Sequence, residues 1–219
     1  MNTLAPRLDV LPAAQRRLWA EFRDGLPPAF VLYGGTALAL RTGSRESEDF
    51  DFFSNEPLDA HALHATLPFL AGAELIQAAP ATATYLVDRS GRVKVSFFGG
   101  LLLGRVGEIS VCEDNGVRVA SLLDLAAQKV RVVQVRAERK DYLDLLTLFA
   151  HGIALPTALG AAKALYPDFA PLITLKALSY FEDGDLGALP DQVTQTLSDA
   201  AAAVLTPTPV SRLSDRLSE

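Results

Sequence analysis

The first part of the chain alternates between short apolar runs and amphipathic segments, which is typical of a mixed α/β fold. Apolar residues recur at helical spacing within residues 11–24, so an opening helix is predicted there, ending before Pro27 and Pro28. The elements predicted after it are a strand over residues 29–33, a helix over 36–41, a strand over 49–53 and a helix over about 58–70.

Residues 73–120 carry short segments of alternating apolar and polar positions, the usual signal of β-strands. Two hairpin turns are indicated, one at residues 88–91 and one at residues 114–116. The predicted strands cover residues 73–77, 82–88, 92–98, 108–112 and 117–120.

The pattern becomes helical after residue 120. We predict one long helix from Ser121 to about Phe149, with Asp124 as part of its cap, and a frayed tail over residues 206–219. Three prolines, each tolerated in a first helical turn, open the later helices: Pro156, Pro171 and Pro190. The predicted fold class is therefore α+β. A mixed β-sheet with flanking helices is expected over residues 1–120, and a C-terminal helical region over 121–219.

The composition is that of a soluble globular protein, with 49% hydrophobic and 21% charged residues. No apolar stretch approaches the ~20 residues that a membrane span requires, and the N-terminus lacks a signal-peptide core. The single cysteine, Cys112, excludes an internal disulfide framework and a cysteine-based zinc cluster. We therefore predict a cytoplasmic protein with no membrane partner.

The formal net charge of −6 argues against a protein that coats nucleic acid non-specifically, because such binding needs many Lys and Arg contacts to phosphates. A local basic patch is still compatible with this charge. Five basic residues fall close together, and on charge alone they are interpreted as a solvated helix face. They are Lys129, Arg131, Arg136, Arg139 and Lys140.

The block that carries chemistry is Gly34–Gly35 followed by Asp49 and Asp51. On a strand, the two aspartates share one face and repel each other unless a cation lies between them. Mg²⁺ takes one or two carboxylates and completes its shell with water and substrate phosphates. Two glycines between a strand and a helix leave backbone N–H groups for those phosphates. The block therefore predicts a site for Mg²⁺ and a phosphate chain.

The segments GGTALAL and RESEDFDFF resemble the signature of the AbiEii/AbiGii toxin family, within the DNA polymerase β-like nucleotidyltransferase superfamily. The family pattern is GGT-x-L, a helix, then Arg-x-Ser-x-Asp-x-Asp-Phe, and every position has a match. Residues 124–129 and 136–145 resemble the family's later motifs, a lysine on a helix and an Arg–Asp–Asp run. The resemblance covers about residues 29–150 and implies a nucleotidyltransferase-like sheet.

The resemblance implies Mg²⁺-dependent transfer of a nucleotidyl group from an NTP to a hydroxyl acceptor. Asp49 and Asp51 would bind Mg²⁺, Lys129 would neutralise charge on the triphosphate, and Asp141 would assist the attacking hydroxyl or a metal. The implied acceptor is RNA, notably the tRNA acceptor end, and the implied partner is an antitoxin encoded nearby. The residues implied to hold the nucleotide are Gly34, Gly35, Thr36, Arg45 and Ser47.

One position departs from the superfamily pattern, which places a third carboxylate on a later strand. Ser96 occupies that position, and a serine cannot supply the formal negative charge. Asp88 could substitute, although an aspartate in a hairpin turn is more typical of turn stabilisation. Lys129 and Asp141 would lie about 18 Å apart along one unbroken helix, so they could line one cleft only if that helix bends or breaks.

Three functions follow from these observations. The function we expect is an active, toxin-like nucleotidyltransferase of a type IV toxin–antitoxin or abortive-infection system. The second is a catalytically impaired nucleotide- or partner-binding module on the same fold, which Ser96 favours. The third is a small-molecule (antibiotic) nucleotidyltransferase, because an acidic surface suits a cationic acceptor.

Overall fold

The computed structural model describes residues 2–218, which divide into two compact units. The sheet unit comprises residues 2–104, 108–121 and 214–218. The helical unit comprises residues 105–107 and 122–213.

A mixed eight-stranded sheet forms the centre of the sheet unit, in the order β1-β7-β8-β2-β3-β6-β5-β4. The central pair β2–β3 is antiparallel, whereas β3 runs parallel to β6. The strands are β1 (Asn2–Leu4), β2 (Val31–Tyr33), β3 (Asp49–Phe53), β4 (Glu74–Ala79), β5 (Thr82–Asp88), β6 (Arg92–Phe98), β7 (Ser110–Cys112) and β8 (Arg118–Val119).

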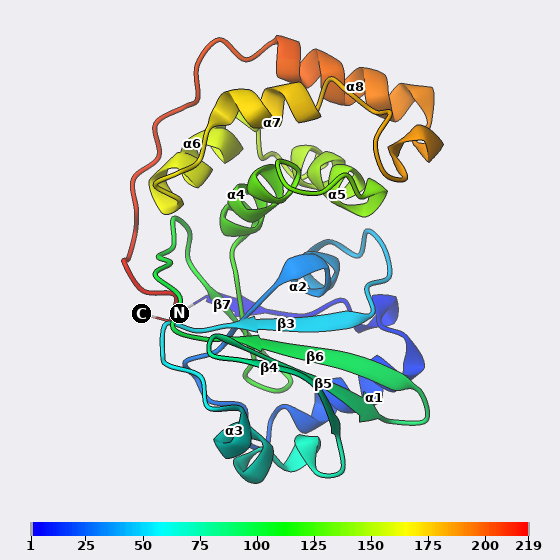
Figure 1. The fold of residues 1–219 in the computed structure, drawn as a ribbon, viewed down its shortest axis with the longest axis vertical. Coiled ribbons are helices and arrows are strands. Elements are labelled where there is room, and N and C mark those ends of the chain that lie inside the picture. The colour runs from blue at the N-terminus through cyan, green and yellow to red at the C-terminus, as the bar shows by residue number, and fades with distance from the viewer. Residues whose placement is uncertain (1, 219) are drawn as a thin grey trace. The chain divides into compact units, whose positions relative to one another are not determined.

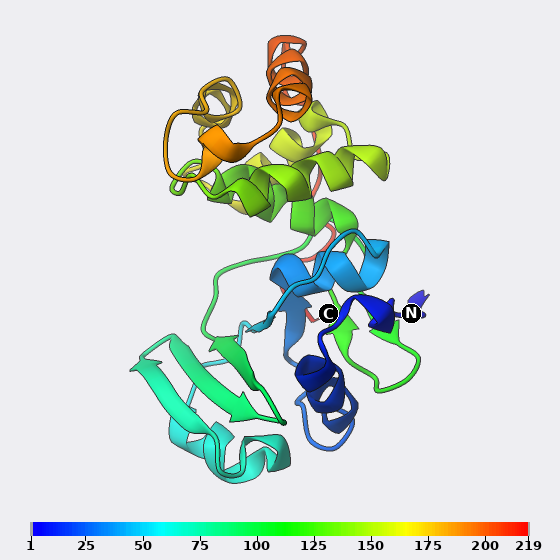
Figure 2. The ribbon, with the colours of Figure 1, turned by 90° about the vertical axis from the view of Figure 1, so that its right-hand side faces the viewer.

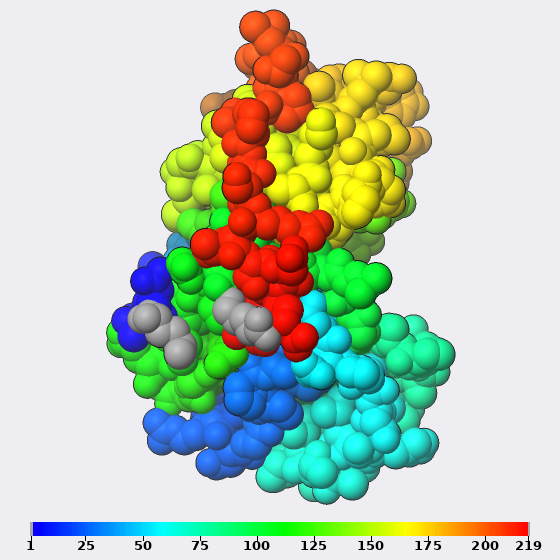
Figure 3. Space-filling view, turned by 90° about the vertical axis from the view of Figure 1, so that its left-hand side faces the viewer, coloured from blue at the N-terminus to red at the C-terminus, as the bar shows by residue number. Residues whose placement is uncertain are grey.

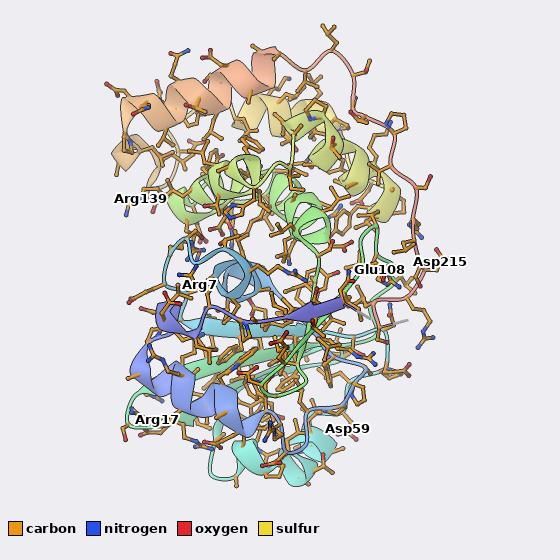
Figure 4. The ribbon with its side chains drawn as sticks, turned by 180° about the vertical axis from the view of Figure 1, so that it is seen from behind. Arg7, Arg17, Asp59, Glu108, Arg139 and Asp215 are labelled. Atoms are coloured by element: carbon orange, nitrogen blue, oxygen red, sulfur yellow. The ribbon has the colours of Figure 1, made fainter. Side chains whose placement is uncertain are left out.

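Helices cover both faces of this sheet: α2 lies on one face, and α1 and α3 lie on the other (Figure 1). Figure 2 shows α3 against the β4–β6 part of the sheet, where the Tyr85 hydroxyl donates to the Ala60 carbonyl at 2.5 Å. Asp59, labelled in Figure 4, caps α3 by accepting the Ala62 N–H at 2.9 Å. The helices of this unit are η1 (Leu8–Val10), α1 (Ala13–Glu21), α2 (Gly34–Thr42), α3 (Ala60–Thr66) and η2 (Pro68–Leu70).

Aromatic side chains form the core between α1 and the sheet. Phe50 and Phe52 are fully buried, and the Phe22 ring meets both edge-on, at centroid distances of 4.8 and 5.2 Å. Trp19 stacks on Phe50 at 5.9 Å. Because side chains alternate along a strand, burying these phenylalanines against α1 turns Asp49 and Asp51 to the opposite face.

The helical unit is built from α4 (Leu122–Val132), α5 (Arg139–Ala150), α6 (Leu155–Leu165), α7 (Pro171–Ala177), η3 (Leu186–Ala188) and α8 (Asp191–Ala202). Its core consists of small and branched residues of α4 and α6, including Leu125, Ala126, Ala158 and Leu159, all fully buried. Residues 203–213, in the red part of Figure 3, run extended along the surface of this unit, where Thr208 N donates to Pro156 O at 2.9 Å.

The α+β class is confirmed, and most predicted elements are present within a few residues of their expected ends. Three predictions were wrong, and one strand was missed. The helix expected over residues 58–70 ends at Thr66, because Pro68 forces Leu67 into an extended conformation. The strand β1 was not predicted, since three residues carry too little periodicity. The tail is not frayed: Leu217 is 1% exposed, and its N–H donates to Asn55 Oδ1 at 2.7 Å.

The third error concerns the long helix expected from Ser121 to Phe149, which is two helices, α4 and α5. Residues 133–138 separate them and contain neither glycine nor proline, so the sequence gives no ordinary breaking signal. Tertiary hydrogen bonds stabilise the non-helical segment instead. Gln134 Nε2 donates to Ala170 O at 3.0 Å and to Thr174 Oγ1 at 2.8 Å.

Within residues 2–218, no single helix is long and apolar enough to cross a membrane; α5 and α6 meet that length and composition only as a pair bent by 112°.

Candidate active site

In the turn between β2 and α2, the backbone of Gly34 lies against the carboxylate of Asp51. Gly34 begins α2 with φ +73°, a left-handed conformation that favours glycine. A Cβ built on Gly34 would meet Asp51 Oδ2 at 2.7 Å, because Tyr33 and Asp51 are paired across β2 and β3. The main chain at Gly34 therefore lies directly against the Asp51 side chain.

Gly35 is enclosed by the loop that leads into β3. A Cβ at Gly35 would meet Arg45 Nη2 at 2.8 Å and Ser47 Oγ at 2.9 Å. Four of the residues implied to hold a nucleotide, Gly34, Gly35, Arg45 and Ser47, are thus brought together, with Asp51 beside them.

The fifth, Thr36, is turned into the protein. It is 1% exposed, and its hydroxyl donates to the carbonyl of Asp49. Gln15 of α1, which is also 1% exposed, donates from Nε2 to Thr36 Oγ1 at 3.3 Å and to Asp49 O at 3.5 Å. Thr36 and Gln15 therefore support the backbone from which the Asp49 carboxylate projects.

Sequence reasoning missed Gln15, although a signal for it exists. It lies at helical spacing with Leu11, Leu18, Trp19 and Phe22, so it is a glutamine within an apolar stripe. Its Oε1 is buried and has no hydrogen-bond partner among the described residues.

Asp49 and Asp51 lie on the same face of β3, as predicted, and each faces a polar residue of β6. The parallel register pairs Asp49 with Lys94 and Asp51 with Ser96. Lys94 Nζ lies 2.7 Å from Asp49 Oδ2, with both side chains about two-fifths exposed, at 42% and 39%.

Ser96 stands beside Asp51 with only 4% of its surface exposed. Its hydroxyl accepts a hydrogen bond from Thr84 Oγ1 of β5 at 3.4 Å. Asp88, the alternative acidic residue, closes the β5–β6 turn by accepting the Gly91 N–H at 3.1 Å. The turn-stabilising interpretation of Asp88 is therefore the one that the structure supports.

The two aspartates fit one hard divalent cation whose shell is completed by water and phosphate oxygens. No group of three or more His, Cys, Asp or Glu side chains that could hold a metal occurs in residues 2–218. The Gly34 main chain lies against the Asp51 carboxylate, so backbone and carboxylate oxygen are neighbours at this end of α2. The donor set thus suits a metal that arrives with a nucleotide.

A second polar cluster lies in the helical unit, across the break between α4 and α5. Lys129 Nζ lies 2.7 Å from Asp141 Oδ1 and 2.5 Å from Asp144 Oδ2. Arg136, from the connecting segment, donates from Nε to Asp141 Oδ2 at 2.7 Å. The break therefore joins residues that one straight helix would hold far apart.

This cluster is almost completely buried at three of its four members, since the Lys129, Asp141 and Asp144 side chains are 5%, 0% and 1% exposed. Burial raises the pKa of Asp141, but the hydrogen bond from Arg136 and the charge of Lys129 outweigh it, so the pKa lies below its ordinary value. Both Asp141 oxygens accept hydrogen bonds, so contact with a substrate would require these ion pairs to open.

The solvated-face interpretation of the basic cluster is wrong for Lys129, which is buried. Arg131 forms a two-point ion pair with Asp168, at 2.8 and 3.1 Å. Lys140 lies 2.8 Å from Glu138 Oε2, and Arg139, labelled in Figure 4, begins α5. Most of the five charges are therefore neutralised by neighbouring carboxylates.

Comparison with known proteins gives the family. Residues 17–210 match the family model described as "Nucleotidyl transferase AbiEii toxin, Type IV TA system". An uncharacterized protein of Aquifex aeolicus (strain VF5) is 32% identical over 179 residues, covering 77% of this chain and 85% of that protein. A solved structure from H. pylori, described as a candidate nucleotidyltransferase, has a TM-score of 0.53 at 21% identity and covers 85% of this chain and 89% of that one.

The family match includes the β2–α2–β3 segment and both helices of the buried ion-pair cluster, and the likeness to the H. pylori structure shows a nucleotidyltransferase-like fold. The chain belongs to the AbiEii family of nucleotidyl transferase toxins from type IV toxin–antitoxin systems.

Proposed function

We propose that this protein is a Mg²⁺-dependent nucleotidyltransferase whose active site is the surface formed by Gly34, Gly35, Arg45, Asp49 and Asp51. The observation that carries the proposal is the close approach of the Gly34 main chain to the Asp51 carboxylate. It supports a site in which amides at the start of α2 bind phosphate beside carboxylate oxygens that bind Mg²⁺.

The triphosphate is held at the beginning of α2. The beginning of a helix carries the positive end of its dipole, so it favours a phosphate group. Ser47 Oγ and the Arg45 guanidinium, which flank Gly35, add a hydroxyl and a positive charge.

Asp49 and Asp51 would hold the Mg²⁺ that accompanies the nucleotide. When bound, this ion supplies positive charge that polarises the phosphate and stabilises the charge that builds up during transfer. Thr36 and Gln15 fix the Asp49 backbone, so its carboxylate is oriented before substrate arrives.

In the proposed reaction, the acceptor hydroxyl oxygen forms a bond to the α-phosphorus, and the bond from that phosphorus to the bridging oxygen of the β-phosphate breaks. Pyrophosphate leaves, and the hydroxyl proton passes to water. No third carboxylate is required, because phosphoryl transfer depends mainly on positioning and on neutralisation of charge.

Lys129 and Asp141 remain part of the proposal because they resemble the family's later motifs and lie within the matched residues 17–210. The role that the resemblance implies for Lys129, neutralising phosphate charge, is kept as part of this proposal. Asp141 and Asp144 would hold the Lys129 ammonium in position. In this proposal Asp141 assists the reaction indirectly, through Lys129.

We propose RNA, and the tRNA acceptor end in particular, as the hydroxyl acceptor. The match to a type IV toxin family supports this choice, as do two partly exposed basic residues, Arg136 between α4 and α5 and Lys140 in the first turn of α5. The same match supports an antitoxin as the functional partner.

The experiment is transfer of α-³²P-labelled ATP, CTP, GTP and UTP to total cellular RNA in the presence of Mg²⁺. Label is expected in a tRNA-sized band, and Asp49→Asn and Asp51→Asn should each abolish it. Glu48→Gln is the matched control, because Glu48 is an exposed carboxylate next to Asp49 that has no assigned role. Equal labelling by the wild type and Asp49→Asn would refute the proposal.

A second candidate is a binding module without turnover, favoured by the replacement of the third carboxylate by buried Ser96. It predicts nucleotide binding by calorimetry but no label with any of the four nucleotides. In that case Ser96→Asp is the substitution that should create transfer.

A further inference from the structure

The sheet face beside the Gly34 turn carries a charge pattern that the proposed function does not yet explain. Two register pairs face each other across β3 and β6: carboxylate with ammonium at Asp49–Lys94, and carboxylate with hydroxyl at Asp51–Ser96. A lysine thus lies directly beside one of the two proposed metal ligands, at 2.7 Å.

This pattern bears on the number of metal ions. Sites with two divalent ions hold them about 3.5–4 Å apart, and their close carboxylates offset the mutual repulsion of the ions. Here two carboxylates share their face with an ammonium, and Ser96 contributes no charge. The site therefore has too little negative charge to bind a second divalent ion, and the Lys94 ammonium already lies beside Asp49.

We infer that Lys94 is the second cation of this active site. It pairs with Asp49 before the nucleotide arrives, and it contacts the triphosphate when Mg²⁺ occupies the two carboxylates. This inference rests on the proposed function, since it assigns Asp49 to the metal.

The geometry allows such an exchange of partners. Lys94 and Asp49 are both about two-fifths exposed, and ion pairs at such positions contribute only about 0.2–1 kcal/mol, so separating them costs little. The lysine side chain is a flexible four-carbon stem with a compact charge, so its ammonium can swing toward a phosphate oxygen without backbone movement.

Arg92 provides a matched control on the same strand. It lies two residues before Lys94, so both side chains point to the same face of β6. Arg92 pairs with Glu74 of β4 at 2.6 Å, with both side chains more than three-fifths exposed. Arg92→Met therefore removes a cation and an ion pair from the same face without touching Asp49.

The first measurement counts bound metal by titrating Mn²⁺, followed by electron paramagnetic resonance, with α,β-methylene analogues of the four NTPs present. One Mn²⁺ per chain is expected for the wild type. Two per chain would overturn the inference.

The second measurement compares Lys94→Met with Arg92→Met. Without nucleotide, Lys94→Met should bind Mn²⁺ about two- to fivefold more tightly than the wild type, because Asp49 has lost its competing partner. Its affinity for the Mg²⁺-bound analogue, measured by calorimetry, should fall about 10- to 100-fold, the size of a lost charge-assisted hydrogen bond. Arg92→Met should leave both affinities unchanged. Identical behaviour of the two variants would overturn the inference.

Two further variants separate the possible failures. Lys94→Arg keeps the positive charge and should recover most of the nucleotide affinity, which a purely structural role for the lysine stem does not predict. Asp49→Asn in the labelling assay tests the proposed function independently. If Asp49→Asn abolishes transfer while Lys94→Met matches Arg92→Met, only the role of Lys94 is wrong; if Asp49→Asn transfers normally, the proposed function fails.

Discussion

At the scale of single residues, Gly34 is the position where backbone conformation and chemistry meet. Its positive φ and its close approach to Asp51 Oδ2 are two separate structural constraints, and each of them disfavours a side chain at this position. Gly72 has almost the same φ, +75°, but nothing lies within 4 Å of a Cβ built there. The two glycines therefore allow the effect of the backbone conformation and the effect of the contact with Asp51 to be tested separately.

Gly34→Ala and Gly72→Ala should lower the free energy of unfolding by similar amounts, about 1–2 kcal/mol, because both force alanine into a left-handed conformation. The clash at Gly34 is relieved by rotation of the flexible Asp51 carboxylate, which costs little stability but moves a proposed metal ligand. Urea unfolding should therefore show similar stability for the two variants, whereas the labelling assay should show loss of transfer only in Gly34→Ala. Loss of transfer in both variants would contradict this account.

Gln15 shows a conflict between stability and function. Its Nε2 makes two long hydrogen bonds, at 3.3 and 3.5 Å, while its Oε1 is buried without a partner among residues 2–218. A buried polar atom without a partner costs about 1–3 kcal/mol.

Gln15→Leu should therefore raise the free energy of unfolding, by about 1 kcal/mol, since it removes this orphan acceptor and keeps an apolar stem. Transfer should fall, because the Asp49 backbone loses one of its supports. Thermal unfolding measured beside kcat and KM tests this prediction. A variant that is less stable and fully active would show that Gln15 is only part of the core.

At the scale of elements, the break between α4 and α5 shows where sequence reasoning succeeded and where it failed. The positions of glycine and proline predicted the β2–α2–β3 segment and the starts of α6, α7 and α8, because these residues act on local backbone conformation. The break at residues 133–138 has no such signal. It depends on Gln134 and on the ion pairs of Lys129, which are contacts that form only in the folded chain.

The same distinction applies to the candidate site. Asp49 and Asp51 could be placed on one face from the period of a strand alone. Gln15 and Lys94 required knowledge of which helix and which strand pack beside β3. The family resemblance pointed to Lys129 and Asp141, but not to the burial that encloses them.

Lys129→Met should lower the free energy of unfolding by about 3–5 kcal/mol, because it leaves the carboxylates of Asp141 and Asp144 buried with reduced compensation. Lys163 is an exposed lysine of α6, so Lys163→Met is the matched control and should change stability by less than about 0.5 kcal/mol. Urea midpoints test this, and equal effects of the two substitutions would mean that the buried cluster adds nothing to folding.

The lowered pKa of Asp141 also predicts a pH dependence. A carboxyl with a folded pKa below the ordinary value of 3.8 binds more protons when unfolded, so its contribution is complete above that value and is lost as pH falls through the folded pKa. The wild type should therefore lose stability more steeply below about pH 4 than Asp141→Asn does.

At the scale of the whole molecule, an acidic chain with a net charge of −6 belongs to a family of nucleotidyl transferase toxins. Negative surface charge reduces non-specific attraction to RNA phosphates, so local contacts would select the proposed RNA acceptor. Such an enzyme should modify few RNA species, and raised salt should weaken RNA binding less than it does for a basic RNA-coating protein.

We propose that the surface formed by Gly34, Asp49 and Asp51 transfers a nucleotidyl group. The most direct test measures pyrophosphate release and nucleotide incorporation into RNA in the same reaction. One pyrophosphate is expected for each nucleotide incorporated. Both products should require RNA and Mg²⁺, and both should be lost in Asp51→Asn but kept in Glu48→Gln. Release of inorganic phosphate in place of pyrophosphate, or pyrophosphate formation that survives Asp51→Asn, would contradict it.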